Sequence, residues 1–458
     1  KDAVLPPDIA DDGVADSPEF FDIIGRETGE PDLTRAFRSL VEQNGLPLIT
    51  VEQIAPSDFV VSQSRYAPLG SQIDPERLWV VPFCWARGDL EARTRDCRLL
   101  TEDLTMASIE LPEGAMIDAG WLLPNADGTG YYRFSLPYDL WQALGRGFSK
   151  LTNAEQLVTM DSAGAEFAAG RIDIQTVWRF IDEAVRDDER RVVQAAIREA
   201  GRFGRLTARD DAALEGYRAA VLDVFSARYQ ALVEAASDDP EQVILKSSLE
   251  RFLVRTGEEE TLRQDLAEAA AAFVGLPDVT SDRVLNTDEY LSALAIGMQV
   301  YREPFLDRLL EARVAFDDPV FEQAVAYAIG ENRDPALNDR ILALALSGEL
   351  GSRETLTIVQ GQMRQDETRA QTWTWLQANF PAFLDVIPRQ RKRASPALAN
   401  ALCSEAEKAE LIQLFESHGE LAEGHERSLS QTTERIELCA AIEDAKGAEV
   451  RAFFAGKR

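Results

Sequence analysis

The feature that most constrains the fold is a change in the spacing of apolar residues at positions 120–133, GWLLPNADGTGYYR. Before this stretch apolar residues recur about every second position, as in strands, and after it about every 3.6 positions, as in helices. Residues 121–123 predict one strand, Pro124 and the Asn, Asp and Gly residues after it predict a reversal, and residues 131–134 predict a second, aromatic strand. We therefore expect a hairpin that joins a β module to a helical one.

The β module precedes this hairpin. Short β-rich segments separated by turn residues lie at 48–51, 59–63, 78–85, 104–109 and 116–119. Together with the hairpin they make about seven strands, the pattern of a small antiparallel β-sandwich. Trp79, Phe83 and Trp121 are predicted to be core side chains, and an aromatic binding cleft is the alternative.

From residue 138 onward the sequence predicts helix after helix. Thr152 and Glu155 have the spacing of a capping box, and Asp173 can cap the next helix. Apolar stripes at helical spacing include Trp141, Leu144 and Phe148; Leu157, Met160, Gly164 and Phe167; Leu214, Tyr217, Val221, Phe225 and Leu232; Leu291, Leu294, Ala295 and Met298; and Phe321, Val325 and Ile329. Helices of roughly 12 to 20 residues joined by short loops suggest stacked pairs, so we expect a large, irregular, HEAT-like α-solenoid without a strict sequence repeat.

The first 46 residues predict two helices. Ser17 and Pro18 are suited to open the first, and Gly45 closes the second. Two helices cannot bury both apolar faces alone, so we expect this segment to be the remnant of a larger domain. The predicted organisation is mixed and mainly α, with domains at residues 1–46, 47–137 and 138–458.

The balance of charges limits the classes of partner. The 458 residues include 48 Lys and Arg against 79 Asp and Glu, a formal net charge of -31. This charge repels phosphate backbones and anionic lipid, so it disfavours nucleic-acid and membrane-surface roles. It would attract a cation such as the α-ammonium group of a peptide, although solubility is the simpler reason for it. No apolar run has the length of a membrane span.

The search for catalytic, cofactor or metal residues yields none. His418 and His425 are seven positions apart, whereas helical zinc ligands lie four apart with a glutamate beside the first, so surface histidines are favoured over a metal site. The sequence lacks a nucleophile elbow and both glycine motifs for nucleotides. The run Glu258, Glu259 and Glu260 predicts a solvated turn or first helical turn.

Two local features leave alternatives open. The basic run RQRKR at 389–393 predicts an exposed loop, and the alternative is a site for a carboxylate such as the C-terminus of a peptide. The four cysteines, Cys84, Cys97, Cys403 and Cys439, allow three pairings, and free core thiols are equally compatible with the sequence. Disulfides would indicate an oxidising compartment.

Several segments, in their order along the chain, carry a resemblance to a known family. They are LTRAFRSLVEQNGLPLITV at 33–51, PNAD at 124–127, GYYR at 130–133, the region 163–170, DPAL at 334–337, WTWLQANF at 373–380 and LSQTTERI at 429–436. The chain resembles the C-terminal half of gluzincin zinc aminopeptidases, the aminopeptidase N-like family. It departs from them at FSLP, residues 134–137, where members more often continue the strand toward a tyrosine.

The resemblance implies that this chain has a non-catalytic role. In the family, the helical domain closes over the active site and limits which peptides reach it, and the parent enzyme releases N-terminal residues from peptides with zinc. Neither the zinc motif His-Glu-x-x-His nor the Gly-x-Met-Glu-Asn motif occurs here. We therefore expect zinc in the parent only, a chain that hydrolyses nothing by itself, and the missing catalytic domain and peptides as partners.

Two alternatives remain from the sequence: a free-standing α-solenoid scaffold that binds proteins, and a hydrolase with unrecognised residues. The chain begins at Lys1, which suggests a processed or truncated N-terminus. A reading frame with the zinc motif just before Lys1 would favour the aminopeptidase. The resemblance implies a periplasmic or secreted location, with a cytoplasmic one as the alternative.

Overall fold

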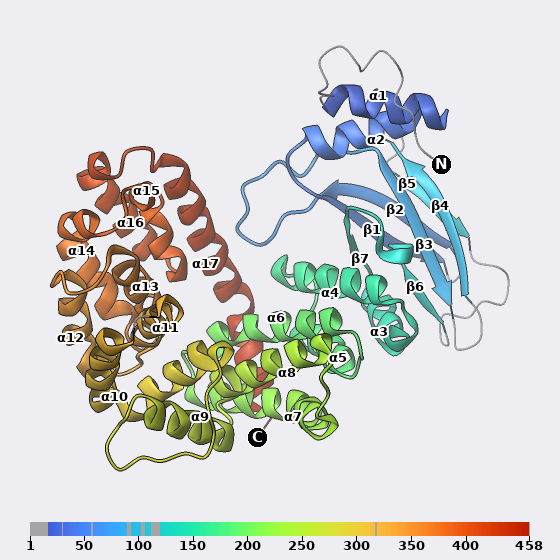
Figure 1. The fold of residues 1–458 in the computed structure, drawn as a ribbon. Coiled ribbons are helices and arrows are strands. Elements are labelled where there is room, and N and C mark those ends of the chain that lie inside the picture. Colours follow the sequence, from blue (N-terminus) through green and yellow to red (C-terminus); the bar gives the residue numbers. More distant parts are fainter. Residues whose placement is uncertain are drawn as a thin grey trace. The chain divides into compact units, whose positions relative to one another are not determined.

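The structure, a computed structural model, describes residues 17–29, 31–55, 58–88, 93–101, 106–110, 120–316 and 318–457. The chain divides into two compact units (Figure 1). The first comprises Lys1–Pro68 and Gln72–Glu199, and the second comprises Leu69–Ser71 and Ala200–Arg458. Most of the described residues are helical, with two small sheets in the first unit and a large helical second unit. The three predicted domains remain a prediction.

The first unit combines helices with seven described strands. Its elements are α1 (Ser17–Thr28), α2 (Pro31–Glu42), β1 (Pro47–Ala55), β2 (Asp58–Arg65), β3 (Val81–Gly88), β4 (Arg93–Leu100), β5 (Met106–Glu110), β6 (Trp121–Leu123), β7 (Arg133–Ser135), α3 (Tyr138–Arg146), α4 (Asn153–Ala168), α5 (Ile174–Val185) and α6 (Arg190–Thr207), which continues into the second unit. One sheet has the order β5-β2-β1-β7 and the other β4-β3-β6. The pairings are antiparallel except that β1 and β7 run parallel.

The predicted hairpin at 120–133 is wrong, because its two strands do not pair with each other. β6 pairs with β3 in one sheet, and β7 pairs with β1 in the other. The connection between them is held by Asn125, a fully buried side chain whose amide nitrogen donates to the carbonyl of Gly130 at 2.9 Å and whose amide oxygen accepts from the Gly130 N–H at 2.9 Å. This clamp closes a compact loop that carries the chain from one sheet to the other.

Four of the other five predicted strands coincide at least in part with strands of the structure. Those at 48–51, 59–63, 78–85 and 104–109 overlap β1, β2, β3 and β5, and that at 116–119 lies outside the described residues. Strand β4, RTRDCRLL, was missed because it is an edge strand whose side chains are mostly exposed, so it shows no apolar alternation.

The predicted core residues of the first unit are confirmed. Trp79 and Phe83 are fully buried and Trp121 nearly so, as core side chains rather than a cleft. The stripe of α3 is also buried: the Trp141 ring lies 5.3 Å from that of Phe134, centroid to centroid, so that the first helix after β7 packs directly on it.

Glu155 is fully buried at the start of α4, and its hydrogen bonds connect α4 to β4 and to the loop between β6 and β7. Its carboxylate accepts hydrogen bonds from Arg93 on β4 at 2.8 and 2.5 Å, from the Asp127 N–H at 2.8 Å and from the Thr152 N–H at 2.9 Å. The bond to Thr152 completes the predicted capping box. Burial opposes ionisation, but these hydrogen bonds outweigh it and lower the pKa of Glu155 below its ordinary value of 4.5.

The Glu155→Gln variant is expected to lose about 2 kcal/mol of stability at neutral pH, because a charged acceptor is replaced by an amide. A carboxyl group with a lowered folded pKa stabilises the fold above its unfolded value and loses this effect as pH falls through the folded value. The difference from wild type should therefore be largest near pH 7 and shrink below about 4.5. Urea titrations at several pH values measure it, with the exposed Glu76→Gln as control. A pH-independent difference would contradict this account.

The second unit is built from helices that pack on their neighbours in sequence. They are α7 (Asp211–Ala235), α8 (Pro240–Phe252), α9 (Glu260–Phe273), α10 (Tyr290–Ala315), α11 (Pro319–Gly330), α12 (Pro335–Leu346), α13 (Ser352–Gln362), α14 (Arg369–Val386), α15 (Arg389–Lys392), α16 (Glu405–His418) and α17 (Glu426–Ala455). Within α10, Arg302 adopts φ 54° and ψ -124° just before Glu303 and Pro304, so this element is two helices joined by a sharp break.

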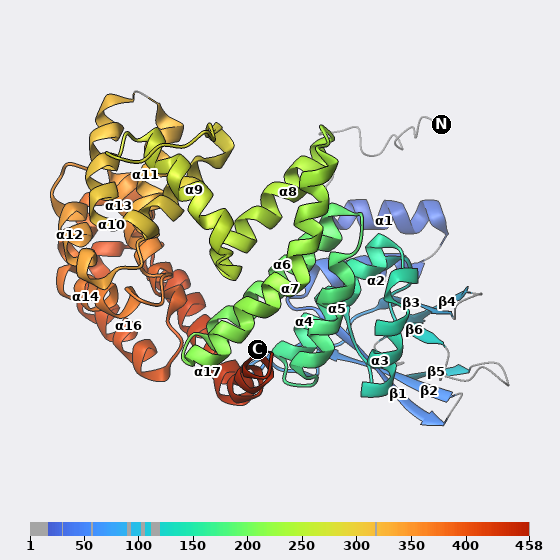
Figure 2. The ribbon, with the colours of Figure 1, turned by 90° about the horizontal axis from the view of Figure 1, so that it is seen from below.

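Helix α17 returns along the unit and packs against α7 (Figure 2). The contact depends on Gly216, since a Cβ there would lie 2.0 Å from the carbonyl oxygen of Phe454. The final helix is thereby joined to the first helix that lies wholly within the unit. Two apolar clusters fill the interior, one around α9 to α11 and one around α14, α16 and α17.

Candidate functional site

Polar residues of the second unit collect at one edge of its helical array. Antiparallel helices in sequence place every second turn on the same side. Four such turns are the π-helical turn Leu253–Gly257 after α8, the break at Arg302, residues 331–334 and residues 363–368. Contacts between the turns support this placement. We call the group Arg218, Arg255, Arg263, Arg302 and Arg333 with its partners the arginine-rich edge.

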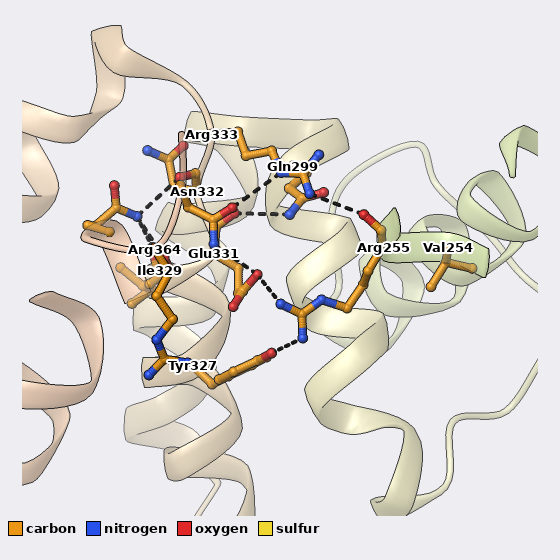
Figure 3. A network of polar contacts seen from close by, with 12 residues as sticks. Val254, Arg255, Gln299, Tyr327, Ile329, Glu331, Asn332, Arg333 and Arg364 are labelled. Atoms are coloured by element: carbon orange, nitrogen blue, oxygen red, sulfur yellow. Dashed lines mark hydrogen bonds and ion pairs between the residues drawn. The ribbon is translucent and has the colours of Figure 1, made fainter. Parts of the chain in front are cut away.

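Glu331 lies at the centre of this edge and is only 1% exposed. Its carboxylate accepts from Arg255 Nη2 at 2.8 Å and from Gln365 Nε2 at 3.1 Å, while its carbonyl oxygen accepts from Gln299 Nε2 at 3.1 Å (Figure 3). Arg255 also donates to the Tyr327 hydroxyl. Glu331 thus joins residues from the π-helical turn Leu253–Gly257, from α10 and from the turn after α13, and Arg255 extends the network to Tyr327 on α11.

Glu258 forms a second junction. Its backbone is left-handed, with φ 52°, and its Oε1 accepts from Arg218 at 2.6 Å and from Arg333 at 2.5 Å. Arg333 also donates to the Arg255 carbonyl at 3.3 Å. The prediction for residues 258–260 was a solvated turn or first helical turn. It is wrong for Glu258, which is held by two arginines, but Glu259 caps α9 by accepting from the Leu262 N–H at 2.6 Å, and Glu260 is the first residue of that helix.

The edge carries more positive than negative charge. Arg218 and Arg333 share the carboxylate of Glu258, and Arg255 pairs with that of Glu331. Arg263 donates to the Val254 carbonyl and to Gln299 Oε1 instead. The electrostatic consequence is visible at Arg263, whose pKa is lowered by desolvation and by the nearby Arg333 and Arg218, against the opposing effect of Glu258. Because both carboxylates are held in ion pairs, the arrangement is suited to fixing helices and presenting positive charge, not to proton transfer.

The residues considered for metal binding are not brought together. His425 stacks on Phe415 with ring centroids 4.9 Å apart, and its Nδ1 lies 3.2 Å from the Ala422 carbonyl oxygen. His418 lies beside Phe380. Among the residues that the structure describes, no three His, Cys, Asp or Glu side chains are grouped as metal ligands. The described part of this chain therefore does not fit a resident zinc ion.

The basic run and the cysteines are placed clearly. Arg389, Arg391 and Arg393 are exposed, and residues 389–392 form the short helix α15 in place of the predicted loop. The cysteines form two disulfides, Cys84–Cys97 and Cys403–Cys439. Cys84 and Cys97 face each other across β3 and β4, while Cys403 precedes α16 and Cys439 lies on α17. No described helix is both long and apolar enough to cross a membrane.

Comparison with known proteins identifies the helical array. Residues 121–438, more than half of the chain, match the model of the family described as ERAP1-like C-terminal domain. The chain belongs to this family. Aminopeptidase N from Plutella xylostella is 31% identical over 109 residues, which cover 23% of this chain and 11% of that relative. The predicted resemblance to the C-terminal region of aminopeptidase N-like enzymes is thereby confirmed.

Sequence reasoning missed the arginine-rich edge. Its members come from turns that are far apart in the sequence, and single arginines within an acidic chain carry no local signal. One signal was available at residues 331–335, ENRDP, where a charged pair stands between an apolar stripe and a helix-opening Asp-Pro. Charged residues confined to a short turn between buried helices are positioned for contacts with other turns.

Proposed function

We propose that this chain is the non-catalytic C-terminal region of a zinc-dependent aminopeptidase, and that it closes over the active site and controls access of peptides. The parent reaction would be release of N-terminal residues from peptides. The family match over residues 121–438 carries this proposal. Zinc would activate water in the catalytic part, while the residues of this chain would bind peptide, limit its length and exclude solvent.

The finer architecture belongs to the same proposal. The two sheets would face each other as a β-sandwich, and the helices would form an irregular HEAT-like solenoid whose stacking makes a curved wall. Two continuous apolar clusters and the ion pairs between turns support a wall that moves as one body. Such rigidity suits a lid, because a flexible wall would not discriminate peptides by length.

The same proposal places the chain in a secreted or periplasmic setting. Both disulfides support it, since such bonds persist chiefly in oxidising compartments. Free thiols would have favoured the cytoplasm. The alternative function, a free-standing scaffold for protein partners, is favoured only by the large helical surface itself.

The purified chain is expected to bind no stoichiometric zinc and to hydrolyse no aminoacyl-amide, because its sequence lacks the family's zinc motif. When it is combined with the catalytic part encoded upstream of Lys1, it should change the rate for long peptides far more than the rate for aminoacyl-amides. Metal analysis and kinetics on peptides of graded length measure both. Turnover by the chain alone would favour the unrecognised hydrolase, and an upstream frame without the zinc motif would favour the scaffold.

A further inference from the structure

The disulfide Cys84–Cys97 lies at the edge of a sheet in the first unit. The two cysteines are directly opposite each other in the antiparallel pair of β3 and β4, with their Cα atoms 4.0 Å apart. Among the described strands β4 pairs with β3 only, so it is an edge strand of the sheet β4-β3-β6. Cys97 on β4 is exposed, whereas Cys84 on β3 is half-buried. The disulfide therefore has one partner that solvent reaches freely.

The backbone of Cys84 faces the other neighbour of β3. The Tyr132 hydroxyl lies 3.4 Å from both the backbone nitrogen and the carbonyl oxygen of Cys84, and it donates to the carbonyl of Pro124, just after β6, at 2.8 Å. A strand residue points its N–H and C=O groups to the same side, so Cys84 directs both toward β6 and away from β4. Cys84 and Cys97 thus form a non-hydrogen-bonded pair, and opening of the disulfide breaks no hydrogen bond of the ladder.

This arrangement makes the two sulfur atoms unequal as targets. In thiol–disulfide exchange a thiolate attacks one sulfur, and the rate depends on access to that sulfur and on how readily the other one leaves. Cys84 lies on the inner strand, between β4 and β6, with the nearly buried Tyr132 against its backbone. Cys97 has no described strand beyond it. Arg95 Nη2 lies 3.8 Å from Cys84 Sγ, so its charge favours Cys84 as the leaving thiolate, although Arg95 also pairs with Asp127.

We propose that Cys84–Cys97 is a reversible thiol–disulfide exchange site for small thiols. The thiolate of a small thiol bonds to the Cys97 sulfur, the bond between the cysteines breaks, and its electron pair leaves with Cys84 as a thiolate. A second thiolate then attacks the sulfur that the small thiol contributed, which releases Cys97 as a thiolate and the disulfide of the small thiol. Two small thiols are thereby oxidised, one protein disulfide is reduced, and the cysteine thiolates take up the two protons that the small thiols gave to the solvent. The reverse reaction closes the bond again.

Exchange at this site acts on the connection between the sheet and the first helices. Arg93, also on β4, donates to the buried Glu155 at the start of α4 at 2.8 and 2.5 Å. Arg93 and Cys97 are four residues apart on one strand, so their side chains lie on the same face of the sheet. Reduction removes the covalent link between β4 and β3, and the ladder and the ion pair of Arg93 must then hold the strand. The redox state of the cysteines thereby sets how firmly β4 connects the sheet to α4.

The first test treats the purified chain at neutral pH with reduced glutathione or with dithiothreitol, blocks free thiols with iodoacetamide at intervals, and identifies the labelled cysteines by peptide mass analysis. Cys84 and Cys97 are expected to become labelled at least about tenfold faster than Cys403 and Cys439, because the rate of exchange follows access. The disulfide of the second unit is the internal control, since both of its cysteines are half-buried. Equal rates for the two disulfides, or faster reduction of Cys403–Cys439, would overturn the proposal.

The second test identifies the sulfur that is attacked. The variants Cys84→Ser and Cys97→Ser each leave one thiol in this sheet and lose the same bond, so their losses of stability should match. The Cys97 thiol of the first variant is expected to react with dithiobis(nitrobenzoate) at least about tenfold faster than the Cys84 thiol of the second. Equal rates, or the reverse order, would contradict attack at Cys97. Near-ultraviolet circular dichroism checks that both variants are folded, and if either is not, the labelling rates of the wild-type chain decide. The aminopeptidase proposal does not depend on this result.

Discussion

Replacing Arg255 with methionine is expected to lower the free energy of unfolding of the helical unit by about 3 kcal/mol. The variant leaves the carboxylate of Glu331, 1% exposed, without its charged partner. Removing one member of a buried ion pair typically costs about 3–5 kcal/mol, and the lower end applies because Arg255 is 31% exposed and water can reach part of the site. Urea denaturation with peptide-resolved hydrogen exchange measures the loss and locates it around residues 327–333.

The double variant Arg255→Met/Glu331→Gln tests the cause. If the cost comes from an orphaned charge, neutralising Glu331 should recover most of the loss, because an amide is buried far more cheaply than a carboxylate. Arg186→Met is the surface control, since Arg186 is 60% exposed, directly follows α5 and pairs with Asp182 four residues earlier. It should cost less than about 0.5 kcal/mol. No recovery in the double variant would show that the stem of Arg255, not its charge, matters.

The features that could be predicted from the sequence are those that adjacent residues determine. The capping box of Thr152 and Glu155 and the cap at Asp173 form as predicted, because each involves backbone groups within three residues. Most residues of the helical stripes also become buried, as at Tyr217 and Phe225, since a stripe needs only its own spacing to turn inward. Leu291 is an exception, because its side chain is 41% exposed at the start of α10.

The features that escaped prediction depend on residues far apart. The loop at 125–130 has every residue of a hairpin turn, and only the existence of two separate sheets shows that it is a crossing. From the sequence alone Glu258 is predicted to be solvated, because its partners Arg218 and Arg333 lie far from it in the chain. One pocket of the second unit is lined by Arg205, Arg364 and Arg435. These residues are even farther apart in the sequence, and they line the same pocket only after the unit has folded. Hydrophobic periodicity specifies faces, but not which polar turns will meet.

Removing the disulfide Cys403–Cys439 is expected to have the largest effect on stability. A double serine variant frees a loop of 36 residues, which in the chain-entropy treatment costs about 4 kcal/mol. The second unit should lose stability, because the bond joins the residues just before α16 to α17 in that unit. Urea denaturation followed by hydrogen exchange measures the loss and shows which helices it affects.

The other disulfide supplies the matched comparison, since Cys84 and Cys97 close a loop of only 13 residues in the first unit. Replacing both by serine should cost about 3 kcal/mol, less than the longer loop, and should increase exchange around β3 and β4 without affecting α17. Under full reduction each double variant should become as stable as the wild-type chain at its own unit, because the only difference is then two sulfur atoms. If a reduced wild type stayed more stable, packing of the sulfurs and not the closed loop would account for the effect.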